Sequence, residues 1–274
     1  MANKESHGLH TLSAAGVLIS LGIIFGDIGT SPIYVLKAIM NMATSGNHPI
    51  TDDLILGGVS CVFWTLTIVV TIKYVIIALN ADNNGEGGIF ALYAIVRRYK
   101  AKWTLIPALL GCASLMADGF ITPPISISSA VEGLTILYPD IQTVPIVIGI
   151  LVIIFLVQQF GTNKIGVLFG PIMFIWFSMI GILGTIQIFH NPSVFKALNP
   201  MYAFNLVLNY PGGFWFLGAV FLCSSGGEAL YSDLGHCGKK NVRVSWTFVK
   251  ITLLLSYFGQ AAFIIGNKNY DFQN

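Results

Sequence analysis

The chain has 274 residues, of which 55% are hydrophobic and only 9% are charged. Soluble domains carry about a quarter of charged residues, so this composition excludes a soluble globular protein. The net charge of +2, from 14 basic and 12 acidic residues, is too small for the basic face that nucleic acid binding requires. The cysteines form no C-x-x-C pair, which argues against disulfides and a metal site.

Long uncharged stretches predict an all-α polytopic membrane protein. A helix needs about 18 to 20 apolar residues to cross a bilayer, and hydropathy, with Gly, Pro and charges as breaks, predicts seven such segments. They cover residues 12–42, 54–79, 104–137, 144–160, 165–189, 213–234 and 244–266. A short amphipathic helix within 85–99 is expected on the cytoplasmic surface.

Basic residues are distributed unevenly among the expected loops. If residues 1–11 form a cytoplasmic tail, the loops after the second, fourth and sixth spans are also cytoplasmic, and they contain most of the loop Lys and Arg residues. The outer loops contain Lys196 and Lys268. By the positive-inside rule the N-terminus is cytoplasmic. The chain is then a multi-pass protein of the cell membrane, with 191–212 as a folded extracellular connection.

Three acidic residues, Asp27, Asp118 and Glu228, lie well inside the expected spans, whereas Glu132 lies near the outer end of the third span and Asp233 near the cytoplasmic end of the sixth. Each costs about 2.5 to 3.5 kcal/mol near a helix centre, so the three together cost about 8 to 10 kcal/mol. Such a cost indicates a function, and a cation pathway is the favoured interpretation. Structural ion pairs are the alternative, but Lys73 and Lys250 lie near cytoplasmic ends and can reach the interface. No enzyme motif is present to suggest catalysis.

Two of these acids accompany glycine-rich interruptions. Asp27 lies in the segment 26–32, which contains two glycines and Pro32, and Glu228 closes the run Ser-Ser-Gly-Gly-Glu over 224–228. Both helices are expected to unwind there. Unwound backbone at membrane depth is tolerated where it lines a cavity, and its carbonyls can coordinate a cation. Paired interruptions of this kind predict one binding site near the membrane midplane.

The third span contributes a polar face. Asp118, Thr122 and Ser126 are spaced by four residues, so on a helix they share one side. Serines in membrane helices often only bond a neighbouring helix or their own backbone, which is the alternative for Ser126. Tyr34 follows Asp27 by seven residues, and its phenol oxygen is a further candidate ligand.

Four motifs in this order resemble the KUP/HAK/KT family of potassium uptake permeases. They are GDIGTSPIY at 26–34, ADNNGEGG at 81–88, DGFITP at 118–123 and EALYSD at 228–233. The resemblance implies the amino acid, polyamine and organocation (LeuT-like) fold, in which two inverted five-helix repeats enclose the site. Residues 12–190 would form the first repeat, and 213–274 would supply two helices of the second. Family members are longer, so this chain is expected to be either a part of a larger permease or a truncated product.

The resemblance implies potassium uptake, in many family members together with protons and without a cofactor. The implied potassium-binding residues are Asp27, Tyr34, Asp118, Thr122, Ser126, Ser225 and Glu228. Glu228 is also the expected proton-coupling residue, because its burial disfavours the charged form. Serine at 225 replaces the usual threonine and keeps the hydroxyl. A homodimer is one assembly to test. The rival interpretations are a transporter of the same fold for an amino acid or another cation, and a channel without proton coupling.

Overall fold

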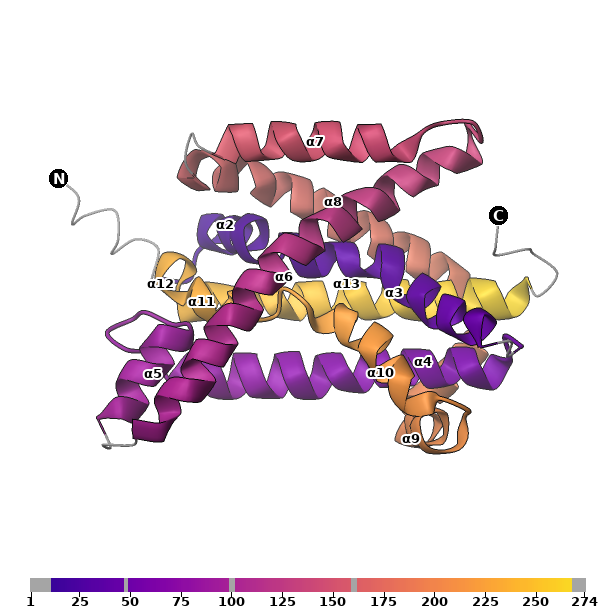
Figure 1. Ribbon diagram of the computed structural model, residues 1–274, viewed down its shortest axis with the longest axis horizontal. Helices are drawn as coiled ribbons and strands as arrows, with labels where there is room; N and C mark the ends of the chain where they lie inside the picture. The colour runs from indigo at the N-terminus through magenta and orange to yellow at the C-terminus, as the bar shows by residue number, and fades with distance from the viewer. Residues whose placement is uncertain (1–10, 47–48, 99–101, 159–161, 268–274) are drawn as a thin grey trace. The chain divides into compact units, whose positions relative to one another are not determined.

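The computed structural model describes residues 11–46, 49–98, 102–158 and 162–267, and the described residues are mainly helical (Figure 1). They form two compact units, and several helices pass from one unit to the other along the chain. The first unit contains 1–28, 71–174 and 225–247, and the second contains 29–70, 175–224 and 248–274. Each unit is described by itself.

Long apolar helices confirm the expectation of a multi-pass membrane protein. Among the described residues, five of them have the length and composition to cross a membrane, and helices α2 (Ala14–Ile24) and α3 (Gly26–Ser45) together make a sixth, broken candidate. The five are Asp52–Asn80, Leu105–Ile136, Phe169–His190, Gly213–Ser232 and Lys239–Gly266. Helix α7 (Thr143–Gln158), in the fourth expected span, is apolar but shorter. The last span begins at Lys239 instead of 244, so Lys239, Lys240 and Arg243 lie in a helix and not in a loop.

The first interruption is shorter than the sequence predicts. Helix α2 (Ala14–Ile24) ends before Phe25, whose φ of −99° and ψ of 10° leave the helical region, and α3 (Gly26–Ser45) begins at the next residue. The expectation that 26–32 is unwound is therefore wrong. Pro32 lies inside α3, and Asp27 lies in the first turn of that helix.

Helix α3 tolerates Pro32 because side chains bond the carbonyls around it. Proline has no N–H and disturbs the hydrogen bonds of the preceding turn. In the second unit, Trp176 Nε1 donates to the Gly29 carbonyl at 2.9 Å, and Gln260 Nε2 donates to the Pro32 carbonyl at 3.0 Å. These two bonds stabilise carbonyls close to Pro32, and α3 remains helical there.

In the first unit, α2 is held against the start of α13 (Lys239–Gly266). The buried Asn241 amide accepts from the Ser13 backbone N–H at 3.2 Å and donates to the Cys237 carbonyl at 2.9 Å. Further along, the Ser20 and Ser245 hydroxyls are hydrogen-bonded, and the rings of Phe25 and Trp246 stack with their centroids 6.2 Å apart. These contacts fix the end of α2 just before Asp27.

Helices α5 (Ile89–Arg97), α6 (Leu105–Glu132) and α7 pack in sequence in the first unit. The expected short helix within 85–99 is α5. Helix α6 is continuous through Pro123 and Pro124, so the face of the predicted third span is preserved. The first unit also holds two single-turn helices, α11 (Ala229–Ser232) and α12 (Leu234–Cys237).

The second unit is built around α4 (Asp52–Thr65), which contacts α9 (Pro200–Asn209) and α10 (Gly213–Phe221). A π-helix over Leu66–Ile77 and a short turn of 3₁₀-helix continue the α4 span. The connection over 191–212 is folded as expected, with a 3₁₀-helix at Pro192–Leu198 followed by α9. Its extracellular position stays a prediction. Helix α8 (Thr162–His190) leads into this connection.

Candidate functional site

The second interruption is an open turn of four residues. A short 3₁₀-helix ends at Ser224, residues 225–228 form turns, and α11 begins at Ala229. Gly226 has φ of +81°, a conformation that side chains with a Cβ rarely adopt. A Cβ there would also lie 2.8 Å from Asp27 Cβ and 2.9 Å from the Ile28 backbone nitrogen. Only glycine allows this turn to pack against Asp27.

This close approach gathers the three intramembrane acids. One carboxylate oxygen each from Asp27, Asp118 and Glu228 lies within 4.8 Å of the other two. The three come from the start of α3, the middle of α6 and the turn before α11, and each is half-buried. Segments about a hundred residues apart in the chain therefore converge on one acidic cluster.

Two hydroxyls complete the cluster around Asp118. Thr122 Oγ1 and Ser225 Oγ each donate to Asp118 Oδ1 at 3.0 Å, and the two hydroxyl oxygens lie 3.4 Å apart. Thr122 reaches back one turn of α6, while Ser225 reaches across from the second interruption. Hydrogen bonds to a carboxylate are about twice as strong as neutral ones, so these contacts fix the Asp118 side chain.

The sequence-predicted residues divide into two groups. Five of the seven lie together in the first unit: Asp27, Asp118, Thr122, Ser225 and Glu228. Ser126 lies one turn further along α6 and is half-buried. Tyr34 belongs to the second unit, where its side chain is 6% exposed. Binding roles for all seven stay predictions.

The role of Gly226 was not predicted from the sequence. The Gly-Gly pair before Glu228 indicated only a break, whereas the structure shows that Gly226 packs against Asp27 with no room for a Cβ. The available signal was the pairing of a glycine with an acid at both interruptions. That pattern is typical of a helix break, and it does not say which glycine faces the other segment.

The cluster offers oxygen ligands only. Carboxylates and hydroxyls are the groups that bind hard cations, whereas zinc and copper prefer His nitrogen and Cys sulfur. Asp118 Oδ1 already accepts from the Thr122 and Ser225 hydroxyls, so these two oxygens lie within hydrogen-bond distance of the carboxylate. The arrangement can hold a small cation or a proton shared among the acids.

A cavity of about 410 Å³ lies in the described part of the second unit, apart from the acidic cluster. It is lined mostly by apolar side chains, with Lys37, Gln187, Ser256 and Gln260 as polar members, and no acidic residue is among the lining residues that the structure describes. An apolar groove with one basic side chain does not suit a cation. The acidic cluster is therefore the stronger candidate for an ion site.

Comparison with known proteins gives a consistent match. The chain matches the family described as the K+ potassium transporter integral membrane domain over residues 14–273. It is 59% identical over 275 residues to a probable potassium transport system protein Kup of Cytophaga hutchinsonii, covering 98% of this chain and 41% of the relative. The relative of the same name from Flavobacterium johnsoniae is 60% identical, with the same coverage.

A more distant relative, also named probable potassium transport system protein Kup, comes from Clostridium perfringens. It is 50% identical over 277 residues, covering 97% of this chain and 41% of the relative. The chain thus spans about two fifths of the length of the relatives it matches. No solved structure matches it.

Proposed function

Because the chain belongs to the KUP/HAK/KT family of potassium transporters, we propose that the gene product carrying it takes up potassium by potassium/proton symport. The observation that carries the proposal is the convergence of three carboxylates within 4.8 Å. In this proposal the ion is bound between the broken first and sixth spans and the third span, and no cofactor takes part.

Charge balance supports the pairing of potassium with a proton. Two like charges 4.8 Å apart repel by about 3 kcal/mol at an effective dielectric constant of about 20. Three ionised carboxylates therefore disfavour an empty, fully deprotonated site. One potassium ion neutralises one charge, and a proton on a second acid removes another. A site that needs a potassium ion and a proton to balance its charge is suited to transport the two together.

Two roles, potassium binding and proton transfer, are assigned to different residues of the cluster. Asp27 and Asp118, with the Thr122 and Ser225 hydroxyls, are the proposed potassium ligands, and Tyr34 and Ser126 are proposed as additional ones. Glu228 is proposed to carry or gate the proton, because it lies on the turn between two helix segments and contributes one of the three clustered oxygens. A membrane potential supplies about 2.3 kcal/mol per charge per 100 mV, so it can drive uptake of both ions into the cell.

The topology is part of the same proposal. We infer the LeuT-like inverted-repeat fold, with residues 12–190 as its first repeat and a cytoplasmic N-terminus. The paired interruptions at Phe25 and at 225–228 support the fold, because such breaks occur at corresponding positions of inverted repeats. The basic residues of the loops support the orientation. A homodimer is left to be tested by the mass of the purified protein.

The experiment is uptake of ⁸⁶Rb⁺, a potassium substitute, into potassium-uptake-deficient bacteria or proteoliposomes at several external pH values. The wild type is expected to take up rubidium faster at acid pH. Glu228→Gln, which removes the charge and keeps the shape, is expected to lose the acid stimulation. Glu132→Gln is the matched control, since it changes an acid at the end of α6 that is not one of the three clustered carboxylates.

Three results would contradict the proposal. Acid-stimulated uptake that survives in Glu228→Gln would remove the proton role of that residue. Uptake that ignores pH in the wild type would favour a channel. Uptake of an organic amine or amino acid without uptake of rubidium would favour the rival transporter of the same fold.

A further inference from the structure

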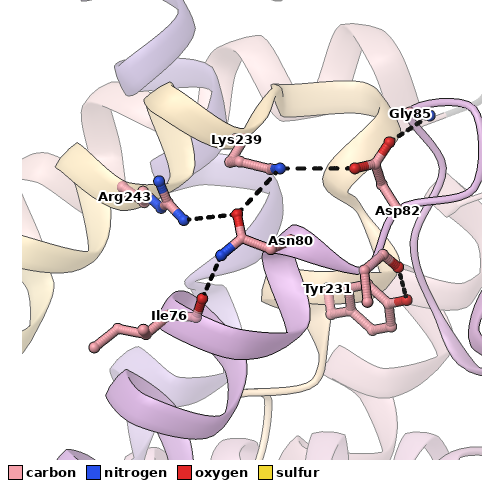
Figure 2. A network of polar contacts seen from close by, with 8 residues as sticks. Ile76, Asn80, Asp82, Gly85, Tyr231, Lys239 and Arg243 are labelled. Atoms are coloured by element: carbon pink, nitrogen blue, oxygen red, sulfur yellow. Dashed lines mark hydrogen bonds and ion pairs between the residues drawn. The ribbon is translucent and has the colours of Figure 1, made fainter.

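A tight hairpin turn joins the second span to α5. Asn83 and Glu86 exchange two backbone hydrogen bonds, of 2.9 and 3.1 Å. The central residues, Asn84 and Gly85, have φ of 55° and 86°, which defines a type I′ turn with its preferred Asn-Gly pair. Asp82 Oδ2 accepts from the Gly85 backbone N–H at 3.0 Å (Figure 2). The segment 81–88, called the hairpin loop below, is therefore locally ordered.

The hairpin loop contacts α11 directly. The Tyr231 phenol donates to the Ala81 carbonyl at 2.5 Å (Figure 2), and the Tyr231 side chain is 6% exposed. On the other arm of the loop, a Cβ on Gly87 would lie 1.8 Å from the Tyr231 carbonyl oxygen. The two arms thus hold the phenol and the backbone of the same residue.

Further contacts fasten the hairpin loop to α12 and α13. The Glu86 carboxylate lies over Gly235, where a Cβ would come within 2.5 Å of Oε2. Lys239 Nζ lies 3.6 Å from Asp82 Oδ1. Just before the loop, Asn80 Oδ1 accepts from Lys239 Nζ at 3.3 Å and from Arg243 Nη2 at 3.2 Å, as the dashed lines of Figure 2 indicate.

Tyr231 is coupled to Glu228 through the backbone. The N–H groups of Tyr231 and Ser232 both donate to the Glu228 carbonyl at 3.0 Å. Helix α11 has only four residues, and a helix this short has no stability of its own. Whatever holds Tyr231 therefore sets the position of Glu228 at one end of the turn, while the contact of Gly226 with Asp27 holds the other end.

We propose that the hairpin loop is a clamp that positions Glu228 in the carboxylate cluster, with Tyr231 and Gly87 as its positioning residues. This inference rests on the proposed function, because it gives the loop a role at the proposed ion site. The contacts of the loop described above reach α11, α12 and α13 and not the three acids. It acts through α11, and the Asp82–Lys239 pair, which is exposed to solvent and so worth little, is its outer fastening.

The test is Tyr231→Phe in the gene product that carries this sequence, with ⁸⁶Rb⁺ uptake measured as KM and Vmax at equal abundance in the membrane. The variant keeps the ring and removes one hydrogen bond. Such a bond contributes about 0.5 to 1.5 kcal/mol, so KM for rubidium is expected to rise about twofold to tenfold. Tyr210→Phe is the matched control, because that phenol also donates to a backbone carbonyl, of Pro49 at 3.4 Å in the second unit.

A second variant tests the backbone contact. Gly87→Ala is expected to raise KM more than Tyr231→Phe, since its Cβ would displace the Tyr231 carbonyl. Gly149→Ala in α7 is its control, because a Cβ there meets nothing within 4 Å. If Gly87→Ala does not reach the membrane, the result for Tyr231→Phe decides.

The outcomes separate the clamp from the proposed function. A raised KM in Tyr231→Phe, with Tyr210→Phe at the wild-type value, supports the clamp. An unchanged KM in Tyr231→Phe, with or without a fall in abundance, overturns the clamp and leaves the transport function intact. Absence of rubidium uptake by the wild type overturns the proposed function, and the clamp with it.

Discussion

The two glycine-rich interruptions resemble each other in sequence and differ in backbone. At the first, only Phe25 leaves the helix, and Asp27 already lies in the first turn of α3. At the second, residues 225–228 form turns and Gly226 has φ of +81°. A glycine paired with an acid thus indicates a break without fixing its length. The length of the break depends on which backbone groups the surrounding side chains can hydrogen-bond.

The largest expected effect comes from placing the same substitution at both interruptions. Gly226→Ala forces a Cβ to within 2.8 Å of Asp27 Cβ at a positive φ, and overpacking and strain each cost about 1 to 3 kcal/mol. Uptake of rubidium is expected to be lost. Gly26→Ala meets nothing within 4 Å and lies in a helix, so thermal unfolding and uptake are expected to stay near the wild-type values. Equal effects of Gly226→Ala and Gly26→Ala on uptake would contradict the proposed difference between the two interruptions.

The next largest effect is expected for Asp118→Asn, which removes the charge that the second interruption contacts through Ser225. The two hydroxyl hydrogen bonds to this half-buried charge contribute about 1.5 to 3 kcal/mol each, so weakening both costs at least about 2 kcal/mol. The ratio Vmax/KM for rubidium is therefore expected to fall at least about thirtyfold. A fall of less than threefold, at equal membrane abundance, would exclude Asp118 as a ligand.

Ser225 allows a smaller, graded test of the second interruption. Ser225→Ala removes one of the two hydroxyl donors to Asp118 Oδ1, and a hydrogen bond to a charged group contributes about 1.5 to 3 kcal/mol. Vmax/KM is expected to fall at least about tenfold. Ser225→Thr keeps the hydroxyl and is expected to retain most of the uptake. If alanine and threonine behave alike, the hydroxyl has no role in transport.

Pro32→Ala tests whether the first interruption needs its proline. Because α3 is already helical through Pro32, and its neighbouring carbonyls accept from Trp176 and Gln260, the substitution is expected to change rubidium uptake by less than about twofold. The melting temperature of the detergent-solubilised protein is expected to stay or rise slightly, since alanine favours helix. A large loss of uptake would indicate that unwinding around Pro32 takes part in transport.

The smallest expected effect concerns pH at the joint between α11 and α12. Burial raises the pKa of Asp233 above its ordinary 3.8, against an opposing effect of nearby His236. A raised pKa means that the folded state favours the protonated acid. The resulting stability is present below pH about 4 and is lost as pH rises through the higher folded-state pKa. Asp233→Asn is expected to flatten this part of the curve of melting temperature against pH, with the wild type as control.

Much of the fold was predictable from the sequence because apolar length and charge position decide where a chain can cross a bilayer. The span at Asp52–Asn80 and the short helix α5 lie close to their expected places. The start of the last span at Lys239 was missed, because basic residues in the first turn resemble a loop in a hydropathy profile. The helical state of 26–32 was missed because it depends on Trp176 and Gln260, distant in sequence.

The residues of the acidic cluster were predictable from their chemistry, and their arrangement was predictable only in part. Asp27, Asp118 and Glu228 were identifiable because intramembrane acids are costly, and they do converge. The direction of the Ser225 hydroxyl toward Asp118 could not be inferred, since it depends on the left-handed backbone at Gly226. Spacing alone placed Ser126 on the same face as Thr122, and it does not say which of the two contacts Asp118.

The hydrogen bond from the Gly85 N–H to Asp82 also bears on how this protein ages chemically. An Asn-Gly pair ordinarily deamidates when the glycine nitrogen loses its proton and attacks the asparagine side chain, which closes a succinimide ring. Here that nitrogen donates to a carboxylate at 3.0 Å, so its proton is held and the attack on Asn84 is hindered. The carboxylate that shapes the turn therefore also protects the exposed amide beside it from spontaneous decay during long storage.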